Sequence, residues 1–364
     1  MELLYRLALA LIPNIGDVQT RLLIQHLGDA TSVFRERADV LEKIEGIGTV
    51  RADAIRSFSN FDRAEAELRF IEQHDIRALF LTDRDYPQRL LQVYDPPPLL
   101  FYKGIADLNA PKMLSIVGTR SHTEYGRQIT ESLVGELARE NITIVSGLAF
   151  GIDGFAHRAA LKHNLPTVGV TGHGLDLVYP YEHTSLAREM ISAGGVLTEF
   201  FSGTKPDRHH FPLRNRIVAA ISDATVVVET HIKGGSMITA KLADSYNRDV
   251  LAFPGRPIDR MSSGCNELIK YNKAILLTDG NQLLDLLGWK RREAPVRQAQ
   301  RSLFIELTEE EQRILQLMDE KGTVHLSELQ VALGLSSSSL ASILLNLEVS
   351  NLITGLPGNN YRLL

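Results

Sequence analysis

Residues 112–118 read KMLSIVG, and after a polar stretch residues 142–147 read ITIVSG. Each is a short apolar run rich in β-branched residues that ends in a glycine, as buried strands often do. Five more short apolar runs follow, two of which also end in a glycine, and stretches with helical spacing separate them. The runs are PTVGVTG (166–172), GVLTEF (195–200), ATVVVET (224–230), DVLAFPG (249–255) and AILLT (274–278), and the helical stretches lie near 127–140, 154–163, 183–192, 212–222, 236–247 and 265–272.

This alternation of strands and helices predicts the fold class. Continuous apolar strands that alternate with amphipathic helices indicate a parallel sheet covered on both faces. The sequence therefore predicts an α/β protein with a Rossmann-like, doubly wound, mostly parallel sheet. We place this domain at residues 106–289.

The predicted strands end in turns rich in glycine, hydroxyl groups and charge. In an open α/β sheet these turns gather at the carboxyl edge, where ligands bind at the switch point. Such turns offer backbone N–H groups to an anion, and glycine lets the ligand approach closely. Together with Arg120, Lys233 and Arg256 they predict a phosphate-binding rim. The turns lie at 118–121, 146–153, 171–174, the loop after Glu199, 230–236 and 254–256.

Two common phosphate-binding motifs are missing from these turns. The dipeptide Gly-Lys does not occur, so the G-x-x-x-x-G-K-[ST] loop of many ATPases is absent. The first turn reads GTRSHTEYG and not G-x-G-x-x-G, and the second strand ends in Ser146 and Gly147, where dinucleotide-binding proteins place a carboxylate. Arg120 in the first turn suits a bidentate phosphate contact instead.

Residues 205–216, KPDRHHFPLRNR, place four cations around one aromatic residue, Phe211. Cations that follow a backbone beside an aromatic platform are what single-strand binding requires. A simpler interpretation makes Phe211 a hydrophobic staple and the arginines surface ion-pair partners. The glycine-rich rim favours single-stranded nucleic acid.

Residues 1–105 are expected to form a helical domain. IPNIGDVQTRLLIQHLG and IEGIGTVRADAIRSF resemble helix-hairpin-helix motifs, whose turns offer N–H groups to phosphate. Neither turn holds a basic residue, so a small helical packing module is the main alternative. The prolines of YDPPPLLFYKG (94–104) are expected to form a stiff connector.

Residues 290–302 form a predicted basic linker, and residues 303–364 follow the element order of a winged helix. Thr308 before three glutamates is a capping-box pattern. The expected recognition helix, residues 336–352, has no Lys or Arg and one Glu. Because major-groove readers need cationic or amide side chains there, we expect a protein contact or regulatory role for this domain.

The net charge of −5 is unevenly distributed. Residues 303–364 hold eight acids and three bases, so the first 302 residues carry no net charge. A domain without net charge can still have a locally basic surface. The single cysteine, Cys265, excludes an internal disulfide, no apolar run approaches a membrane span, and Glu2 argues against a signal peptide. We expect a cytoplasmic protein.

Several titratable residues receive structural interpretations. His157 and His163 are expected at a helix surface or core edge and not as a metal pair. Asp153 is expected to cap the following helix. Glu199 and Glu229 end strands and are general-base candidates, but we favour hydrogen bonds to loop N–H groups or arginines.

The same turns carry a family resemblance. IVGTR, SGLAFGIDGFAHRAAL, GLDLVYP, FPLRNRIVAAIS, VVVETHIKGGSMITA and FPG followed by GCNELI resemble, in that order, the DNA processing protein A family (DprA, also called Smf). The resemblance implies a cytoplasmic bacterial protein of natural transformation. It would bind and protect incoming single-stranded DNA, load a RecA-type recombinase, and dimerise through the Rossmann-like domain, with no membrane partner.

The resemblance also assigns roles to positions of this sequence. The arginine of the family's first turn falls on Arg120 with Ser121 beside it, the basic residue before the aromatic falls on Arg208, and the base-contacting aromatic falls on Phe211. The segment 214–216 matches the family's R-N-R. Two departures leave loop geometry open: the loop HIKGGS before the helix at 236, and the histidines at 209 and 210 beside the aromatic.

The candidate DNA-binding residues follow from the phosphate-binding rim, the basic segment 205–216 and the family resemblance. We expect no catalytic residue, cofactor or metal. One alternative is a nucleotide-processing enzyme of the phosphoribohydrolase type using Glu199 or Glu229, and another is a sequence-specific regulator acting through the winged helix. The candidates are Gly118, Thr119, Arg120, Ser121, Gly147, Gly151, Lys205, Arg208, His209, Phe211, Arg214, Asn215, Arg216, Lys233, Gly234, Gly235 and Ser236.

Overall fold

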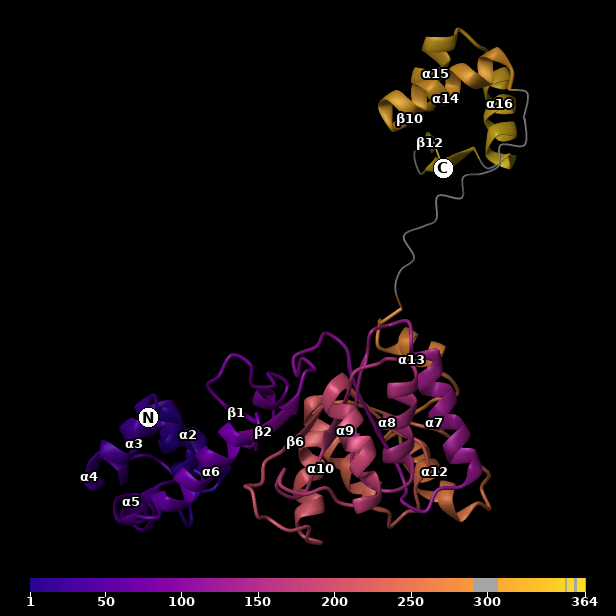
Figure 1. Ribbon diagram of the computed structural model, residues 1–364. Helices are drawn as coiled ribbons and strands as arrows, with labels where there is room; N and C mark the ends of the chain where they lie inside the picture. Colours follow the sequence, from indigo (N-terminus) through magenta and orange to yellow (C-terminus); the bar gives the residue numbers. More distant parts are fainter. Residues whose placement is uncertain (291–306, 351, 357–358, 364) are drawn as a thin grey trace. The chain divides into compact units, whose positions relative to one another are not determined.

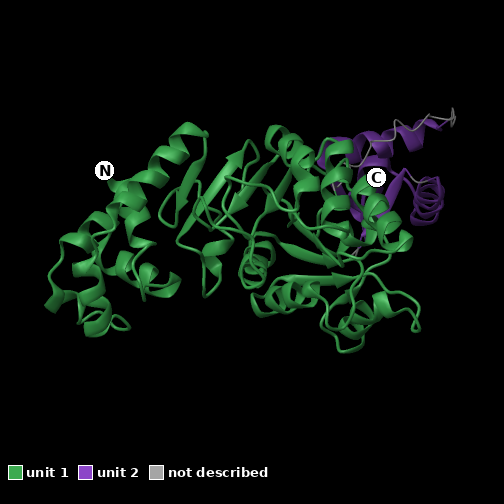
Figure 2. Ribbon diagram, turned by 60° about the horizontal axis from the view of Figure 1, so that its bottom comes forward, with its two compact units in different colours: residues 1–291 green, residues 292–364 purple. Residues whose placement is uncertain are grey.

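A computed structural model describes residues 1–290, 307–350, 352–356 and 359–363. The chain divides into two compact units, Met1–Arg291 and Arg292–Leu364, coloured separately in Figure 2. The predicted basic linker at 290–302 lies outside the described residues except for Lys290.

The first unit is built on a nine-stranded sheet with the order β1-β2-β6-β5-β4-β3-β7-β8-β9. Its centre is parallel from β6 to β9, and β2 and β1 add antiparallel strands at one edge (Figure 1). The mostly parallel, doubly wound sheet predicted from the sequence is confirmed, and all seven predicted strands are present. They are β3 (Met113–Val117), β4 (Thr143–Gly147), β5 (Thr167–Val170), β6 (Gly195–Thr198), β7 (Ala224–Val227), β8 (Asp249–Ala252) and β9 (Ile275–Leu276).

Helices cover both faces of this sheet because successive strand residues point to opposite sides. On β3, Met113 and Val117 pack in a core with α10 and α11, whereas Leu114 and Ile116 pack in a core with α7, α8 and α13. The helices of this part are α7 (Glu124–Glu136), α8 (Ile152–Lys162), α9 (Thr184–Ala193), α10 (His210–Ile221), α11 (Gly235–Ser245), α12 (Ser263–Lys270) and α13 (Gly280–Leu286), with short 3-10 turns η2 (Tyr181–His183) and η3 (Arg260–Ser262).

The order of the strands creates a switch point next to β3. From β3 the chain moves to β4, β5 and β6 on one side, and later to β7, β8 and β9 on the other. Crossover loops therefore leave the carboxyl end of β3 in opposite directions. In doubly wound sheets this is where ligands bind.

The N-terminal helices lie at one end of the sheet, beside β1 and β2 (Figure 1). They share an apolar core with Phe80, Leu99 and Phe101 of those strands. The helices are α1 (Glu2–Leu9), α2 (Asp17–Leu27), α3 (Ala30–Arg35), α4 (Ala38–Leu41), α5 (Gly48–Ser57) and α6 (Phe61–Gln73).

The sequence predicts a helical domain over residues 1–105, but the last part of this segment contains strands. β1 (Arg77–Phe80) pairs with β2 (Leu99–Gly104), which pairs with β6, and the turn η1 (Leu90–Gln92) lies between β1 and β2. Prolines 96–98 precede β2 and do not interrupt its pairing, because they lie before its first ladder residue. These strands join the helical part to the sheet within one compact unit.

The second unit is a winged helix. It contains α14 (Glu309–Lys321), α15 (Leu326–Leu333), α16 (Ser337–Val349) and a three-stranded sheet of β10 (Thr323–His325), β12 (Asn360–Leu363) and β11 (Ile353–Leu356). The predicted capping box is present, since Thr308 Oγ1 accepts from Glu311 N and Glu311 accepts from Thr308 N.

Membrane-spanning helices were also sought in the part of the chain that the structure describes. No single helix there is long and apolar enough to cross a membrane. One pair, α15 with α16, reaches the required length and hydropathy only when the two are combined, and the chain bends by 114° between them.

Candidate nucleic-acid interface

A cleft of about 450 Å³ opens at the carboxyl ends of β3, β4 and β7. It lies at the switch point of the sheet, where the sequence places the rim. Its walls come from the loops after these three strands and from the segment that enters α10. Twelve of the seventeen candidate residues line it: Gly118, Thr119, Arg120, Ser121, Gly147, Arg208, Phe211, Arg214, Asn215, Gly234, Gly235 and Ser236.

The loop after β3 is held against its neighbours by close backbone packing. Thr119 N donates to Glu229 O at 2.7 Å, and Ile152 N donates to Thr119 O at 3.2 Å. Gly151 has a φ of +77°, and a Cβ there would lie 2.2 Å from Thr119 O. Gly151 does not line the cleft; it lets the loops after β3 and β4 approach each other.

Phe211 and Arg120 meet across the mouth of the cleft. The Cζ atom of Arg120 lies 4.9 Å from the centroid of the Phe211 ring, within cation–π distance. The ring of Tyr179 lies 6.1 Å away, tilted by 32°, and lines an adjoining hollow with Phe211. Phe211 is half-buried, which leaves part of the ring open to the cleft. The alternative, a hydrophobic staple beside ion-paired arginines, fits Arg216 but not Arg208, which forms no ion pair with the described residues.

Four of the candidate cations form no ion pair with the described residues. Arg120, Lys205, Arg208 and Lys233 are exposed, and within the described residues no carboxylate oxygen lies within 4.0 Å of their charged atoms. Arg120 and Arg208 line the cleft, whereas Lys205 and Lys233 lie outside its lining. Exposed cations without partners leave the local field positive, as a phosphate backbone requires.

The loop before α11 carries the candidate glycines and Ser236. Gly234 is the residue before the first turn of α11, and its N–H donates to His231 O at 2.7 Å. Ser236 is buried and donates from Oγ to Thr230 Oγ1 at 2.7 Å. Lys233 N donates to His231 Nδ1 at 3.1 Å. These contacts fix the loop while leaving the Lys233 side chain exposed.

Arg214 lies at the floor of the cleft and is buried. It donates from Nη1 to Val170 O and from Nε to Asn215 Oδ1, the latter at 3.1 Å. A Cβ at Gly147 would lie 2.4 Å from both Arg214 Nη1 and Asp153 Oδ2, so no larger residue fits there. Burial lowers the pKa of Arg214, against the opposing effect of Asp153.

Asp153 differs from its sequence prediction. α8 begins at Ile152 with Gly151 as its N-cap residue and no side-chain capping bond, so Asp153 does not cap this helix. Its carboxyl lines the cleft floor. Burial raises the pKa of Asp153 to about 6, although Arg214 and the hydroxyl of Ser146 lower it.

Arg216 is turned away from the cleft, contrary to its prediction as a DNA contact. It forms ion pairs with Glu199 and, at 2.7 Å, with Asp17 of α2, and its side chain is 9% exposed. Burial alone lowers the pKa of Arg216, but Glu199 and Asp17 raise it overall. Its three acidic neighbours, Asp17, Asp95 and Glu199, come from distant parts of the sequence. His209 is exposed and does not line the cleft.

The two glutamates considered as general bases have structural partners. Glu229 accepts from Thr123 N at 2.9 Å and from Thr123 Oγ1 at 2.7 Å, and Glu199 binds Arg216. The interpretation of both as hydrogen-bond partners is confirmed.

His157 of α8 has a structural role as well and lies deeper than expected, whereas His163 follows the last residue of α8. His157 is fully buried, with Nε2 hydrogen-bonded to Gly147 O at 2.7 Å and Nδ1 to Thr167 Oγ1, and burial lowers its pKa to about 4. No group of three His, Cys, Asp or Glu side chains in the described residues could hold a metal ion.

Sequence reasoning missed two cleft neighbours, Tyr179 and Asp153. Tyr179 belongs to GLDLVYP, which carried the family resemblance without being connected to Phe211. Asp153 was assigned to helix capping. Neither contact had a local sequence signal, because both depend on how loops from different strands meet.

The fold and cleft define a Rossmann-like protein with a cation-rimmed cleft suited to a phosphate-bearing ligand. Comparison with known proteins is consistent with this class. The family model of DNA recombination-mediator protein A matches residues 77–288, and the DprA winged helix domain matches residues 298–359. The chain therefore belongs to the DNA recombination-mediator protein A family, whose members are named DprA or Smf.

Individual relatives cover most of the chain. Protein Smf of Synechocystis is 37% identical over 294 residues, which are 79% of this chain and 73% of the relative. The solved DprA of Streptococcus pneumoniae has a TM-score of 0.67 at 32% identity and covers 77% of this chain and 95% of its own. The Helicobacter pylori DprA structure, described for its single-stranded DNA binding mode, has a TM-score of 0.53 at 30% identity, with 58% and 95% coverage.

Proposed function

We propose that this chain binds single-stranded DNA in the cleft at the switch point. The phosphates would follow the cations Arg120, Arg208, Lys205 and Lys233, and a base would stack against Phe211. The observation that carries the proposal is the set of exposed cations without acidic partners around a half-open aromatic ring. The Helicobacter pylori relative, described for single-stranded DNA binding, supports the same ligand.

A single strand fits this arrangement better than a duplex. Stacking on an aromatic ring requires an unpaired base, and each stacked base contributes roughly 1–3 kcal/mol. The electrostatic part of binding would depend strongly on salt. We test the proposal by measuring the Kd of the full-length chain for oligo-dT and for a duplex of equal length between 50 and 300 mM salt. Equal affinity for both, or no salt dependence for oligo-dT, would contradict it.

We also propose that binding involves no catalytic step. The two glutamates that an enzyme mechanism would use are held by Thr123 and Arg216, so neither has the freedom expected of a general base. Incubation with nucleoside monophosphates tests the phosphoribohydrolase alternative. Release of free base that Glu229→Gln abolishes would favour the enzyme.

Family membership further supports a role in recombination. We propose that the chain acts in the cytoplasm as a homodimer formed through the Rossmann-like domain. It would protect single-stranded DNA during uptake and load a RecA-type recombinase onto it. Recombinase filament formation on DNA coated with single-strand-binding protein, measured with and without the chain, tests the loading step. No acceleration at saturating chain concentration would argue against it.

For the winged helix we propose a protein contact and not sequence-specific DNA reading. α16 contains no Lys or Arg, and its exposed face includes Leu345 and Val349. Replacing both by serine is expected to change oligo-dT affinity by less than roughly twofold, because surface substitutions that remove no charge usually have small effects. Loss of DNA binding in this variant would assign α16 to the nucleic acid.

A further inference from the structure

One buried carboxylate of α6 connects the N-terminal helices to residues 199–216. This segment contains most of the residues that we propose to contact the DNA strand. Glu67 accepts from Ser202 N at 3.0 Å and 3.1 Å and from Ser202 Oγ at 2.6 Å. Arg63 completes the contact, because it binds Glu67 at 2.8 Å and donates to Ser202 O at 2.6 Å. Glu67 is 1% exposed, so these bonds are shielded from water. We call this contact the Glu67 clamp.

A second contact holds the other end of the same segment. Arg216 binds Asp17, the first residue of α2, at 2.7 Å, and also Glu199. Residues 199 and 216 are thereby joined to each other and to the N-terminal helices. Removing Arg216 would leave Glu199 and Asp17 without their cation, which proteins tolerate poorly at buried positions.

The tip between these two contacts is open. Thr204 O accepts from Gly174 N at 3.1 Å, and Gly203 N donates to Asp176 at 3.0 Å, so the stem of the loop is also fixed to the sheet domain. Beyond it, Lys205 and Arg208 are exposed. The segment is therefore anchored at its base while its cations face solvent.

The helix-hairpin-helix-like motifs contribute to this anchoring. Asp17 directly follows the turn of the first motif, and its carboxylate lies against Arg216. In the second motif, Arg51 donates to Asn14 O at 3.0 Å and to Gly46 O at 2.9 Å, which ties the two turns together. The turn of the first motif thus faces an arginine of the same chain.

We infer that the N-terminal helical segment is a brace that positions the cation-bearing residues 199–216 for the DNA strand, with Glu67 and Asp17 as positioning residues. This inference rests on the proposed function, since the braced cations matter only if they contact the strand. It assigns the helix-hairpin-helix-like motifs to the protein's own binding segment and not to phosphate.

The test replaces Glu67 by Gln in the full-length chain. We expect roughly fivefold weaker binding to oligo-dT, as residues coupled through one contact network typically show. We also expect faster hydrogen–deuterium exchange in residues 199–209 with an unchanged rate in the loop that carries Lys233. A double-mutant cycle measures whether the affinity losses of two substitutions depend on each other, which general destabilisation would not change. Arg208→Ala should cost less affinity in the Glu67→Gln chain, whereas Lys233→Ala should cost the same in both.

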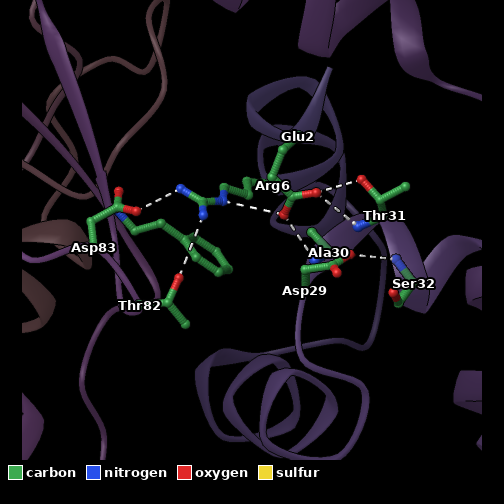
Figure 3. Close-up of polar contacts among 9 residues, drawn as sticks. Glu2, Arg6, Asp29, Ala30, Thr31, Ser32, Thr82 and Asp83 are labelled. Carbon is green, nitrogen blue, oxygen red and sulfur yellow. Dashed lines mark hydrogen bonds and ion pairs between the residues drawn. The ribbon is translucent and has the colours of Figure 1, made fainter.

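Asp83→Asn provides the matched control. Figure 3 shows a comparable cluster in the same helical part, in which Arg6 binds Asp83 at 2.7 Å and Glu2 at 3.3 Å, while Glu2 accepts from Ala30 N and Thr31. This cluster ties α1 to the end of β1 and makes no contact with residues 199–216. Asp83→Asn should leave oligo-dT affinity unchanged.

The outcomes separate the inference from the proposed function. A wild-type chain that does not bind oligo-dT ends both. Wild-type binding with unchanged affinity in Glu67→Gln, or with additive effects in the cycle, overturns the brace alone. If Glu67→Gln fails to fold, Ser202→Ala replaces it, because it removes the 2.6 Å bond to Glu67 and the 3.5 Å bond from Arg63 but keeps the Arg63–Glu67 pair. It should weaken binding in the same direction by a smaller factor, and unchanged affinity overturns the inference.

Discussion

α10 separates two regions whose arginines have opposite surroundings. At the cleft, Arg120 lies over Phe211 and Arg208 is exposed, and neither has an acidic partner within the described residues. On the other side of the helix, Arg216 is buried against Asp17 and Glu199. In the sequence, Arg208 and Arg216 belong to one basic segment.

The difference shows that an arginine's role is decided by its acidic neighbours. A cation without a partner keeps its charge available to a phosphate. A cation enclosed by carboxylates is already neutralised, and removing it leaves those carboxylates without a partner. One basic segment therefore contributes both to the brace and to the proposed DNA contact. Each of these roles can be disrupted separately.

The largest expected effect is on stability and comes from Arg216→Met. It leaves the largely buried Glu199 and the partly exposed Asp17 without their cation, which should cost about 3 kcal/mol of unfolding free energy at pH 7.5, the lower end of the range for buried pairs. Burial already raises the pKa of both carboxyls, so their folded-state pKa would lie above the unfolded value. The folded chain then takes up protons as pH falls, and the loss should shrink toward pH 5. Urea unfolding followed by fluorescence of the single tryptophan, Trp289, measures it.

Arg127→Met is the control for this prediction. Arg127 forms exposed ion pairs with Glu124 at 3.8 Å and Glu131 at 3.4 Å, which should contribute less than about 1 kcal/mol. Similar losses in both variants would remove the distinction between the buried cation and exposed ones.

The second prediction concerns Phe211→Ala at the cleft. Loss of one stacked base should weaken oligo-dT binding by roughly 1–3 kcal/mol and leave the salt slope unchanged, because no charge is removed. Titration of a fluorescent oligo-dT at several salt concentrations measures both quantities. Tyr181, an 82% exposed ring outside the cleft lining, is the matched aromatic control. An equal loss in Tyr181→Ala would contradict the assignment of the platform.

A third, smaller effect is expected from Arg120→Ala. Removal of one phosphate contact should lower the slope of log K against log salt by about 0.7, which is roughly a fivefold loss at 0.1 M salt. The loss should be the same for every DNA sequence, since phosphates carry no sequence information. Arg188→Ala, which removes an exposed arginine of α9, should change neither quantity. An unchanged slope in Arg120→Ala would exclude Arg120 from the phosphate path.

The sheet was predictable because buried parallel strands have a strong local pattern. Short apolar runs, four of which end in glycine, predict β3 to β9, and their carboxyl ends indicate the position of the cleft. β1 and β2 were not predicted because they lack that pattern. β1 has only four residues, and β2 follows three prolines. They are strands because β6 offers an edge to pair with, which only the folded sheet reveals.

The cleft was predictable only in part for the same reason. Arg120 and Phe211 come together because two loops end at one sheet edge, which strand order implies. Arg216 could not be separated from them, because its partners lie at positions 17, 95 and 199. His157 follows the same rule, since its hydrogen bonds to Gly147 and Thr167 place it in the core despite its position on a helix.

The smallest predicted effect sharpens the comparison through pH. Burial raises the pKa of Asp153 at the cleft floor to about 6, so the carboxyl becomes neutral as pH falls from 7.5 to 5 and the cleft gains one positive charge. Oligo-dT binding should therefore tighten by roughly threefold at fixed salt, as expected for one nearby charge in a partly solvated site. Asp153→Asn removes this titration, so its affinity should change less over the same interval. Identical pH profiles for the two chains would mean that the charge of Asp153 does not influence DNA binding. The exposed cations of the rim alone would then determine the affinity for oligo-dT.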